Sequence, residues 1–467
     1  MNLKSILELR KSKKSNTNQN HLIFFEYTSS EIKKICSKFK NVPKPILGYD
    51  LERGFKPSVE GNFDLPEIPS QLALANYSTF AETEEFASEL AKMAQFVGLN
   101  TIFAPVLDVN SNPNNPIINL RSFGSNPKTV AEFGKSFIRG IQKNGVVACA
   151  KHFPGHGNTD LDSHTGLVQS DSDKDFFEQT DLLPFKAAIS ENVGMVMNAH
   201  ISFPKFSENK PASLSPYFLT EILRTELGFD GVLTTDAFSY MAGIGEGDNS
   251  ELCVESLLAG TDIILMPENP ERVEELAKKK ISQEKLLESE QRIEFLRKNF
   301  SAFNSELPKE FDSNNLNKML NDFWGRVVQG VSPSKNVLVQ TNDTEKDLWL
   351  IDKFFTENGF KKIKVKLEDD SFNFLFSKDF SGNGISVSQL KELPEILGIG
   401  LVQIRMNKGT INLNSKQIEL WNSVSKGNEN YILFGSPNSA EKLKGSVCKT
   451  FDFTETCQKF VLDLVFI

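Results

Sequence analysis

Histidine is concentrated in one part of this chain. Four of its five histidines lie between residues 152 and 200, and three of these lie within residues 151–168, KHFPGHGNTDLDSHTGLV. Imidazole titrates near neutral pH without help, so such a concentration indicates proton transfer, metal binding or polar recognition. The segment 153–158 (FPGHGN) excludes a regular helix, because proline and glycine interrupt it. We therefore predict a shaped loop that follows the strand-like segment 146–150.

Metal binding is the least favoured of these roles. His152 and His156 are four residues apart, which is a metal-ligand spacing only on a helix. The glycine-rich segment 243–247 (GIGEG) resembles a phosphate loop, but it follows no clear strand and precedes acidic residues. We expect no metal and no cofactor.

Proton transfer is favoured by the sequence Asp162-Ser163-His164. In an extended turn the aspartate and the histidine can converge, so that Asp162 fixes the ring tautomer and stabilises the imidazolium ion. Such a histidine could donate a proton and recover it in the next step. The alternative is an ordinary hydrogen bond on a surface loop, which is the commoner role of an isolated pair.

Asp236 is a second candidate, because it directly follows the strand-like segment 231–235 (GVLTT). A carboxylate in this position either caps the next segment or acts as a nucleophile. Together with the pair Asp162 and His164, it would make the two-group arrangement of a retaining glycosidase, with one attacking carboxylate and one proton donor.

Three basic residues could bind a polar ligand. Lys151 and His152 could donate hydrogen bonds to sugar hydroxyls, or they could form a salt bridge at a strand end. Arg121, which follows the turn-rich segment 111–116, could hold a polar ligand group or brace a loop.

The elements that must position these residues alternate along the first 300 residues. Strands are expected at 45–50, 100–109, 146–152, 194–200, 231–236 and 261–267, with 22–26 as the candidate first strand. Helices are expected near 82–97, 127–143, 174–190 and 215–227, the last with Ser215 as its cap, Pro216 at its first position and Gly228 at its end. Apolar strands separated by amphipathic helices indicate a parallel sheet covered by helices.

The polar candidates share one position in this pattern, at or just after the carboxyl end of a strand. They are Asp50, Asp108, Lys151, His152, His200 and Asp236. Catalytic residues gather at that end of a (β/α)8 barrel. A doubly wound sheet would place residues similarly, but it usually carries a glycine-rich phosphate turn after its first strand, and residues 48–54 do not form one.

The length of 467 residues predicts one large and one smaller domain. We expect a TIM-like catalytic barrel over 1–300, a linker over 301–335 that follows a charged helix at 282–300, and a small α/β domain over 336–467. In the last domain the strands are expected at 336–340, 361–367, 401–406 and 430–436.

Composition limits the partners. A net charge of −9 argues against nucleic acid, which requires a basic surface. Five scattered cysteines predict no disulfide framework. Neither a leader peptide nor a membrane span is evident in the sequence, so we expect a cytoplasmic protein without a membrane partner, and its oligomeric state stays open.

Taken together, these segments resemble glycoside hydrolase family 3, and in particular its β-N-acetylglucosaminidase branch. The segments that carry the resemblance are 103–116, 121–124, 151–164, 183–189, 195–201, 228–243 and 259–267, in the order of the family. The pattern KHFPGH…DSH is the most specific of them, because the Asp-His loop marks this branch.

The resemblance implies a TIM-like barrel followed by a smaller α/β sandwich-like domain. It implies Asp236 as nucleophile and His164 as acid/base supported by Asp162. It also implies a set of residues that bind the terminal N-acetylglucosamine: Asp50, Arg121, Lys151 and His152, with His200 and Met241 near the sugar. The implied reaction is retaining hydrolysis without a metal, and cell-wall muropeptides are the implied substrates. The family commonly reads D-x-E-G-G-R where this chain has DLERGF at 50–55, so a sugar-contacting arginine is displaced or lost.

Three alternatives remain open at this stage. A β-N-acetylglucosaminide phosphorylase would use the same dyad, because a histidine acid/base need not repel phosphate. A β-glucosidase or β-xylosidase could share the fold. A non-catalytic carbohydrate-binding protein is disfavoured by the intact Asp236, Asp162 and His164.

Overall fold

The computed structural model describes residues 22–24, 29–39, 44–55, 65–159, 168–207, 210–238, 248–303 and 308–331 of the first part of the chain. From 333 to 466 it describes all residues except 335, 342–348, 366–371, 379–383, 394–395, 403–412, 414, 427–429, 451 and 453–454. The chain forms two compact units, Met1–Leu316 and Asn317–Ile467.

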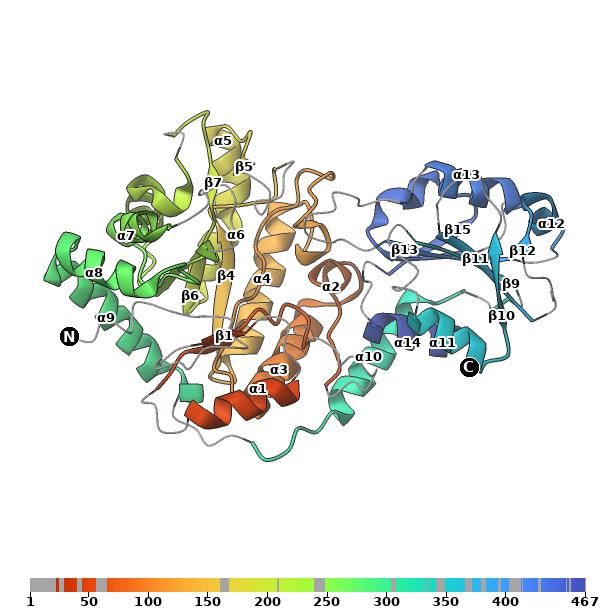
Figure 1. The fold of residues 1–467 in the computed structure, drawn as a ribbon, viewed down its shortest axis with the longest axis horizontal. Helices are drawn as coiled ribbons and strands as arrows, with labels where there is room; N and C mark the ends of the chain where they lie inside the picture. Colours follow the sequence, from red (N-terminus) through yellow and green to blue (C-terminus); the bar gives the residue numbers. More distant parts are fainter. Residues whose placement is uncertain are drawn as a thin grey trace. The chain divides into compact units, whose positions relative to one another are not determined.

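The first unit is built on a sheet of six parallel strands (Figure 1). Their order is β1 (Leu22–Phe24), β2 (Leu47–Tyr49), β3 (Thr101–Ile102), β4 (Val147–Phe153), β6 (Met195–Asn198) and β8 (Val232–Thr235). The order in the sheet is the order in the chain, whereas a doubly wound sheet reverses direction at a switch point. The predicted α/β class is confirmed, and the described strands follow the winding of a barrel. A closed eight-stranded barrel stays a prediction.

Six of the seven strands expected in this unit are present, including the candidate at 22–26. The segment 261–267 does not form the expected strand, because its bridge residues are limited to Ile263, which pairs in parallel with Thr234 of β8, and Ile264. The backbone of Met266 has a φ of +52°, which turns the chain away from an extended course. Two further strands of two residues each were not expected: β5 (Val168–Gln169) and β7 (Ile201–Ser202), which pair in parallel.

The helices α3 (Phe80–Val97), α4 (Pro127–Gln142) and α6 (Leu182–Ser190) lie side by side in Figure 1. A capping box of Thr79 and Glu82 begins α3, and Gly98, with a φ of +97°, ends it. The backbones of α3 and α4 approach closely, since a Cβ atom on Gly140 would lie 2.2 Å from the carbonyl oxygen of Glu84. The helix expected at 174–190 is interrupted, because a π-helical turn, Phe177–Asp181, separates α5 (Lys174–Phe176) from α6.

The helix expected at 215–227 is a π-helical segment, Tyr217–Glu226. Pro216 begins the helix as expected, and Ser215 occupies the capping position, because its backbone is extended and its carbonyl oxygen accepts from the nitrogen of Leu219 at 3.1 Å. Gly228, with a φ of +68°, follows its end as expected. The remaining helices of this unit are α1 (Ser29–Cys36), α2 (Gln71–Tyr77), α7 (Ser250–Ala259), α8 (Pro270–Lys280) and α9 (Gln283–Asn299).

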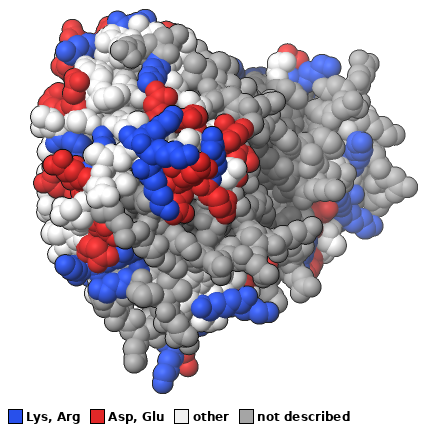
Figure 2. Space-filling model, turned by 60° about the vertical axis from the view of Figure 1, so that its left-hand side comes forward, with Lys and Arg blue, Asp and Glu red and all other residues white. Residues whose placement is uncertain are grey.

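Charged side chains of both signs are interleaved on the face that Figure 2 draws. Some of the surface ion pairs join residues one helical turn apart. On α8, Lys278 pairs with Glu274 at 2.6 Å, and Lys279 pairs with Glu275 at 2.5 Å.

A buried ionic network fixes the amino-terminal end of β8. Asp262 is fully buried and accepts hydrogen bonds from the backbone nitrogen of Leu233 (2.9 Å) and from Arg224 (2.6 Å). Its second oxygen accepts from Ser289 (2.7 Å) and Arg292 (3.0 Å). Both oxygens of this buried carboxylate are therefore satisfied.

The second unit contains a mixed sheet of seven strands in the order β12-β10-β11-β9-β13-β14-β15. They are β9 (Asn336–Thr341), β10 (Lys361–Val365), β11 (Phe372–Ser377), β12 (Gly384–Ile385), β13 (Leu397–Val402), β14 (Asn430–Gly435) and β15 (Ser446–Lys449). The strand expected at 401–406 therefore begins earlier, at residue 397. The helices are α11 (Trp349–Glu357), α12 (Val387–Lys391), α13 (Ser415–Val424) and α14 (Glu455–Phe466), and α10 (Asn314–Val327) lies within the expected linker. Across the described parts of both units, no helix has the length and apolarity needed to cross a membrane.

Candidate active site

The described polar candidates meet at one edge of the first unit's sheet. Asp50 directly follows β2, and Asp236 directly follows β8. Lys151 and His152 are among the last three residues of β4, and His200 lies two residues after β6. Because these strands are parallel and adjacent, their carboxyl ends form a single edge. The expected position at the end of a strand is confirmed for these five residues but is wrong for Asp108, which lies six residues after β3 (Thr101–Ile102) ends.

Lys151 is the buried cation at the centre of the edge, with 1% of its side chain exposed. Its Nζ atom donates to Asp50 Oδ1 at 2.7 Å and lies 2.8 Å from Glu52 Oε1. Burial alone would lower the pKa of this lysine, but Asp50 and Glu52 outweigh it and raise the pKa above its usual value. Lys151 is therefore charged at neutral pH and holds two carboxylates together.

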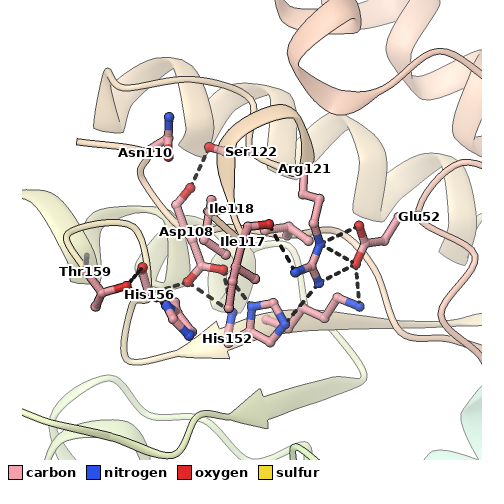
Figure 3. A network of polar contacts seen from close by, with 12 residues as sticks. Glu52, Asp108, Asn110, Ile117, Ile118, Arg121, Ser122, His152, His156 and Thr159 are labelled. Atoms are coloured by element: carbon pink, nitrogen blue, oxygen red, sulfur yellow. Dashed lines mark hydrogen bonds and ion pairs between the residues drawn. The ribbon is translucent and has the colours of Figure 1, made fainter. Parts of the chain in front are cut away.

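Arg121 meets the same carboxylate from the other side (Figure 3). Its Nε atom donates to both oxygens of Glu52, at 3.1 and 2.9 Å, and its Nη2 atom donates to Glu52 Oε1 at 2.7 Å. Burial would raise the pKa of Glu52, but Arg121 and Lys151 hold it well below its usual range. In this structure Arg121 braces Glu52.

Glu52 was not among the residues that the sequence singled out. The alternation of side chains in a strand could not have indicated it, because Leu51, between Asp50 and Glu52, has a φ of +33° and the segment is not extended. The ionised Glu52 joins Arg121 and Lys151, two cations that would otherwise repel each other.

A second network orients His152 through Asp108, which is fully buried. His152 Nδ1 donates to Asp108 Oδ2 at 2.7 Å, and the backbone nitrogen of His156 donates to Asp108 Oδ1 at 2.7 Å. The two histidines lie on either side of Asp108 in Figure 3. Burial would raise the pKa of Asp108, but His152 outweighs it and lowers the pKa. With Nδ1 committed to Asp108, the Nε2 atom of His152 faces Arg121 Nη2 at 3.4 Å.

His156 has a supporting place in the same network. Its Nδ1 atom lies 2.9 Å from Thr159 Oγ1, and burial lowers its pKa to about 4. It is therefore neutral at pH 7 and poorly suited to donate a proton.

Asp236 is half-buried and held by its own backbone surroundings. Its Oδ1 atom accepts from the backbone nitrogen of Ala237 at 2.8 Å, and its own nitrogen donates to Asn198 O at 2.9 Å. Burial would raise the pKa of Asp236, but the nearby His152 and His200, with the Ala237 hydrogen bond, lower it below its usual value. Asp236 is thus an ionised carboxylate beside cationic and polar groups.

His200 contacts the backbone of Asp236 rather than its carboxylate. Its Nε2 atom donates to Asp236 O at 3.4 Å, and its Nδ1 atom lies 2.7 Å from Ser213 Oγ. Burial lowers the pKa of His200 to about 4, so the ring is neutral at pH 7. The ring also packs edge-on against Phe238, with 4.8 Å between centroids.

Asp162, His164 and Met241 lie outside the described residues. Their predicted roles are therefore not placed by the structure. The described site consists of one ionised carboxylate after β8 and a cluster of positive and negative groups around β4.

Comparisons with known proteins identify the class of protein. The profile of the glycosyl hydrolase family 3 N terminal domain matches residues 28–296, which is more than half of the chain. A β-hexosaminidase A of Pseudoalteromonas piscicida is 45% identical over 194 residues, which cover 39% of this chain and 32% of that protein. A β-hexosaminidase of Neisseria gonorrhoeae is 35% identical over 254 residues, which cover 53% of this chain and 70% of that protein.

Solved structures extend the likeness over nearly the whole chain. A β-glucoside phosphorylase has a TM-score of 0.79 at 20% identity, covering 98% of this chain and 90% of that one. A family 3 β-N-acetylglucosaminidase of Paenibacillus sp. has a TM-score of 0.73 at 21% identity, covering 96% and 90%. At this level of identity the likeness shows the fold.

The chain belongs to glycosyl hydrolase family 3, on the evidence of the matched residues 28–296. It spans about one third of the length of the Pseudoalteromonas relative and 70% of the Neisseria relative.

Proposed function

We propose that this protein is a retaining exo-β-N-acetylglucosaminidase that removes terminal β-linked N-acetylglucosamine through a covalent glycosyl-enzyme intermediate. In this proposal Asp236 is the nucleophile, and His164 is the acid/base, supported by Asp162. The observation that carries the proposal is the ionised Asp236 at the carboxyl end of β8, on the same sheet edge as Lys151 and His152. The β-hexosaminidase relatives support the choice of sugar.

The first step requires an ionised nucleophile with an available oxygen. The Ala237 hydrogen bond engages Asp236 Oδ1, so we assign Oδ2 to the attack on the anomeric carbon. The bond from that carbon to the leaving oxygen breaks while His164 protonates the oxygen. In the second step water loses a proton to His164 and attacks the same carbon, which releases Asp236 and the sugar with its configuration retained.

Sugar recognition falls to the cluster around β4. Asp50 keeps 40% of its side chain exposed although Lys151 holds one of its oxygens, so it could accept from a sugar hydroxyl. His152, held by Asp108, and Arg121, held by Glu52, are fixed in orientation before any sugar arrives. We propose that these residues bind the terminal sugar, with His200 and Met241 beside it.

A kinetic comparison tests the two catalytic roles. Asp236→Asn should abolish turnover of an aryl β-N-acetylglucosaminide, because the amide is a poor nucleophile. His164→Ala should lower kcat/KM strongly for substrates with poor leaving groups, and far less for activated aryl substrates. Equal loss on both kinds of substrate would contradict the role of His164 as proton donor. A wild-type protein that is inactive on these substrates, with and without phosphate, would refute the proposal.

Phosphorolysis is the second candidate, and the histidine acid/base favours it. A glutamate at this position would repel an incoming phosphate dianion, whereas His164 would not. The assay above, with inorganic phosphate added, separates the two reactions, because phosphorolysis releases the sugar 1-phosphate. A comparison of aryl β-glucoside, β-xyloside and β-N-acetylglucosaminide substrates tests the alternative sugars.

The substrate source, the cellular location and the complete fold of the catalytic domain are also proposals. We propose muropeptides as the source of the N-acetylglucosaminide, a cytoplasmic location, and a complete (β/α)8 barrel as the catalytic domain. Release of N-acetylglucosamine from purified muropeptides by the protein would support the first of these, and its absence would contradict it.

A further inference from the structure

The residues on either side of the segment 160–167, which carries the proposed acid/base His164, are held by specific contacts. At its beginning, Gly157 lies directly against the backbone of Val109, where a Cβ atom would approach Val109 O to 1.8 Å. The side chain of Asn115 donates to His156 O (2.8 Å) and to Thr159 Oγ1 (3.2 Å). The start of the segment is therefore fixed to the loop that carries Asp108.

The other end of the segment is fixed to a different element. Val168 and Gln169 form β5, which pairs in parallel with Ile201 and Ser202 of β7. The backbone nitrogen of Ser170 continues this pairing with a 2.9 Å hydrogen bond to Ser202 O. Because β7 directly follows His200, the end of the segment is fixed to the chain that leaves β6.

One side-chain bridge joins the two ends. Asn158 Nδ2, from the beginning, donates to Ser172 Oγ, from the end, at 3.2 Å. Ser172 Oγ also accepts from Ser170 Oγ at 2.9 Å and donates to Asp181 Oδ2 at 3.1 Å. Ser172 is buried, with 2% of the residue exposed. Its hydroxyl thus receives two hydrogen bonds and gives one, which fixes its orientation.

Asp181 anchors this bridge to the start of α6. It is buried beside Gly155, where a Cβ atom would lie 2.9 Å from Asp181 Cβ. Its Oδ1 atom has no hydrogen-bond partner among the described residues. Burial raises the pKa of Asp181 to about 8, and Asp108 adds to the rise while Ser172 opposes it. A neutral carboxyl is consistent with an oxygen left without a donor.

We infer that Asn158, Ser172 and Asp181 are positioning residues that hold together the residues before and after the segment 160–167, and that proton donation by His164 depends on this bridge. This inference rests on the proposed role of His164. Because the bridge touches neither Asp236 nor the cluster of Lys151, its loss should affect proton donation more than nucleophilic attack.

The test compares kcat/KM on two β-N-acetylglucosaminides, one with an alkyl leaving group and one with a dinitrophenyl group. The alkyl substrate requires the proton from His164, whereas the dinitrophenyl group leaves without it. We expect Asn158→Ala and Ser172→Ala to lose about tenfold or more on the alkyl substrate and less than about threefold on the dinitrophenyl substrate. Asn158 is only half-buried, so its variant is expected to fold even if Ser172→Ala does not.

Two further variants separate positioning from general destabilisation. Asp181→Asn keeps a neutral acceptor for Ser172 and should retain near wild-type rates on both substrates, whereas Asp181→Ala should behave like Ser172→Ala. Asn144→Ala is the matched control, because Asn144 Nδ2 also donates to a serine, Ser88 Oγ at 3.0 Å, just before the amino end of β4. It should leave the ratio of the two rates unchanged.

Equal losses on both substrates, or no loss in Asn158→Ala, would overturn the inference while leaving the proposed function intact. A wild-type protein that hydrolyses neither substrate would instead refute the proposed function. A changed ratio in Asn144→Ala would also overturn the inference, because general destabilisation would then account for the effect.

Discussion

Replacement of Glu52 by glutamine removes the carboxylate that pairs with both Arg121 and Lys151. Glutamine keeps the shape of the glutamate side chain and one acceptor oxygen. Its amide nitrogen, however, is a donor and would face a donor of Arg121 or Lys151. Hydrogen bonds to charged groups contribute about 1.5–3 kcal/mol each, and breaking a buried ion pair costs about 3–5 kcal/mol. Because 29% of the Arg121 side chain is exposed and Asp50 still holds Lys151, we expect the lower end, about 3 kcal/mol.

The loss of folding stability in Glu52→Gln should depend on pH in a defined direction. The pKa of Glu52 is depressed in the folded state, since Arg121 and Lys151 outweigh the effect of burial. Its contribution to stability is therefore complete above the unfolded pKa of about 4.3 and is lost as the pH falls through the folded value. The difference between wild type and Glu52→Gln should be constant from pH 6 to 8 and narrow in acid.

Urea unfolding followed by far-ultraviolet circular dichroism measures this difference. All three tryptophans, Trp324, Trp349 and Trp421, lie in the second unit, so their fluorescence serves as an internal reference for that unit. Glu178→Gln is the matched control, because Glu178 forms a surface pair with Lys174 at 3.7 Å, and its loss should cost less than about 0.5 kcal/mol. KM for an aryl β-N-acetylglucosaminide should rise about tenfold or more in Glu52→Gln. A stability within about 1 kcal/mol of wild type together with an unchanged KM would refute this reasoning.

Three further outcomes follow from other parts of the structure. Asp108→Asn removes the charge-assisted hydrogen bond to His152 Nδ1, so kcat/KM on an aryl β-N-acetylglucosaminide should fall about 10- to 100-fold, and an unchanged value would count against the orienting role. Asp262→Ala leaves Arg224 and Arg292 without their buried partner, so urea unfolding should show a loss of about 3–5 kcal/mol while KM of the folded protein is unchanged. Asp181, its pKa raised to about 8 by burial and by the charge of Asp108, retains a proton in the folded state that the unfolded chain releases at about pH 3.9, so stability should decline between about pH 4 and 8. Asp181→Asn should flatten that decline, and parallel pH curves for the two proteins would contradict it.

The positions of the site residues could be predicted wherever a polar residue ends an apolar run. Asp50, His200 and Asp236 each follow a strand that the alternation of segments revealed. The shared edge then required only that the strands be parallel and adjacent. The local pattern therefore predicts which residues share the edge, because the order of the strands in the sheet is their order in the chain.

Ion pairs and strand pairings between residues distant in sequence could not be predicted in the same way. Glu52 and Arg121 are 69 residues apart, and neither lies in a regular pattern that indicates the other. The strands β5 and β7 have two residues each, with one polar residue in each pair, which is too short to show alternation. In the second unit, the glycines of LGIGLV hid the start of β13, because glycine weakens the apolar pattern of a strand.

The two ends of β8 have different functions, and this determines which loops can vary in sequence and length. The amino end is locked by Asp262 and its arginines, while the carboxyl end leads into Asp236 and the loops around it. Loops at the carboxyl edge could therefore be exchanged or lengthened during evolution, or in a directed library, without loosening the lock at the opposite end. New specificities for the group beyond the terminal sugar should be found by varying that edge while the residues around Asp262 are left untouched.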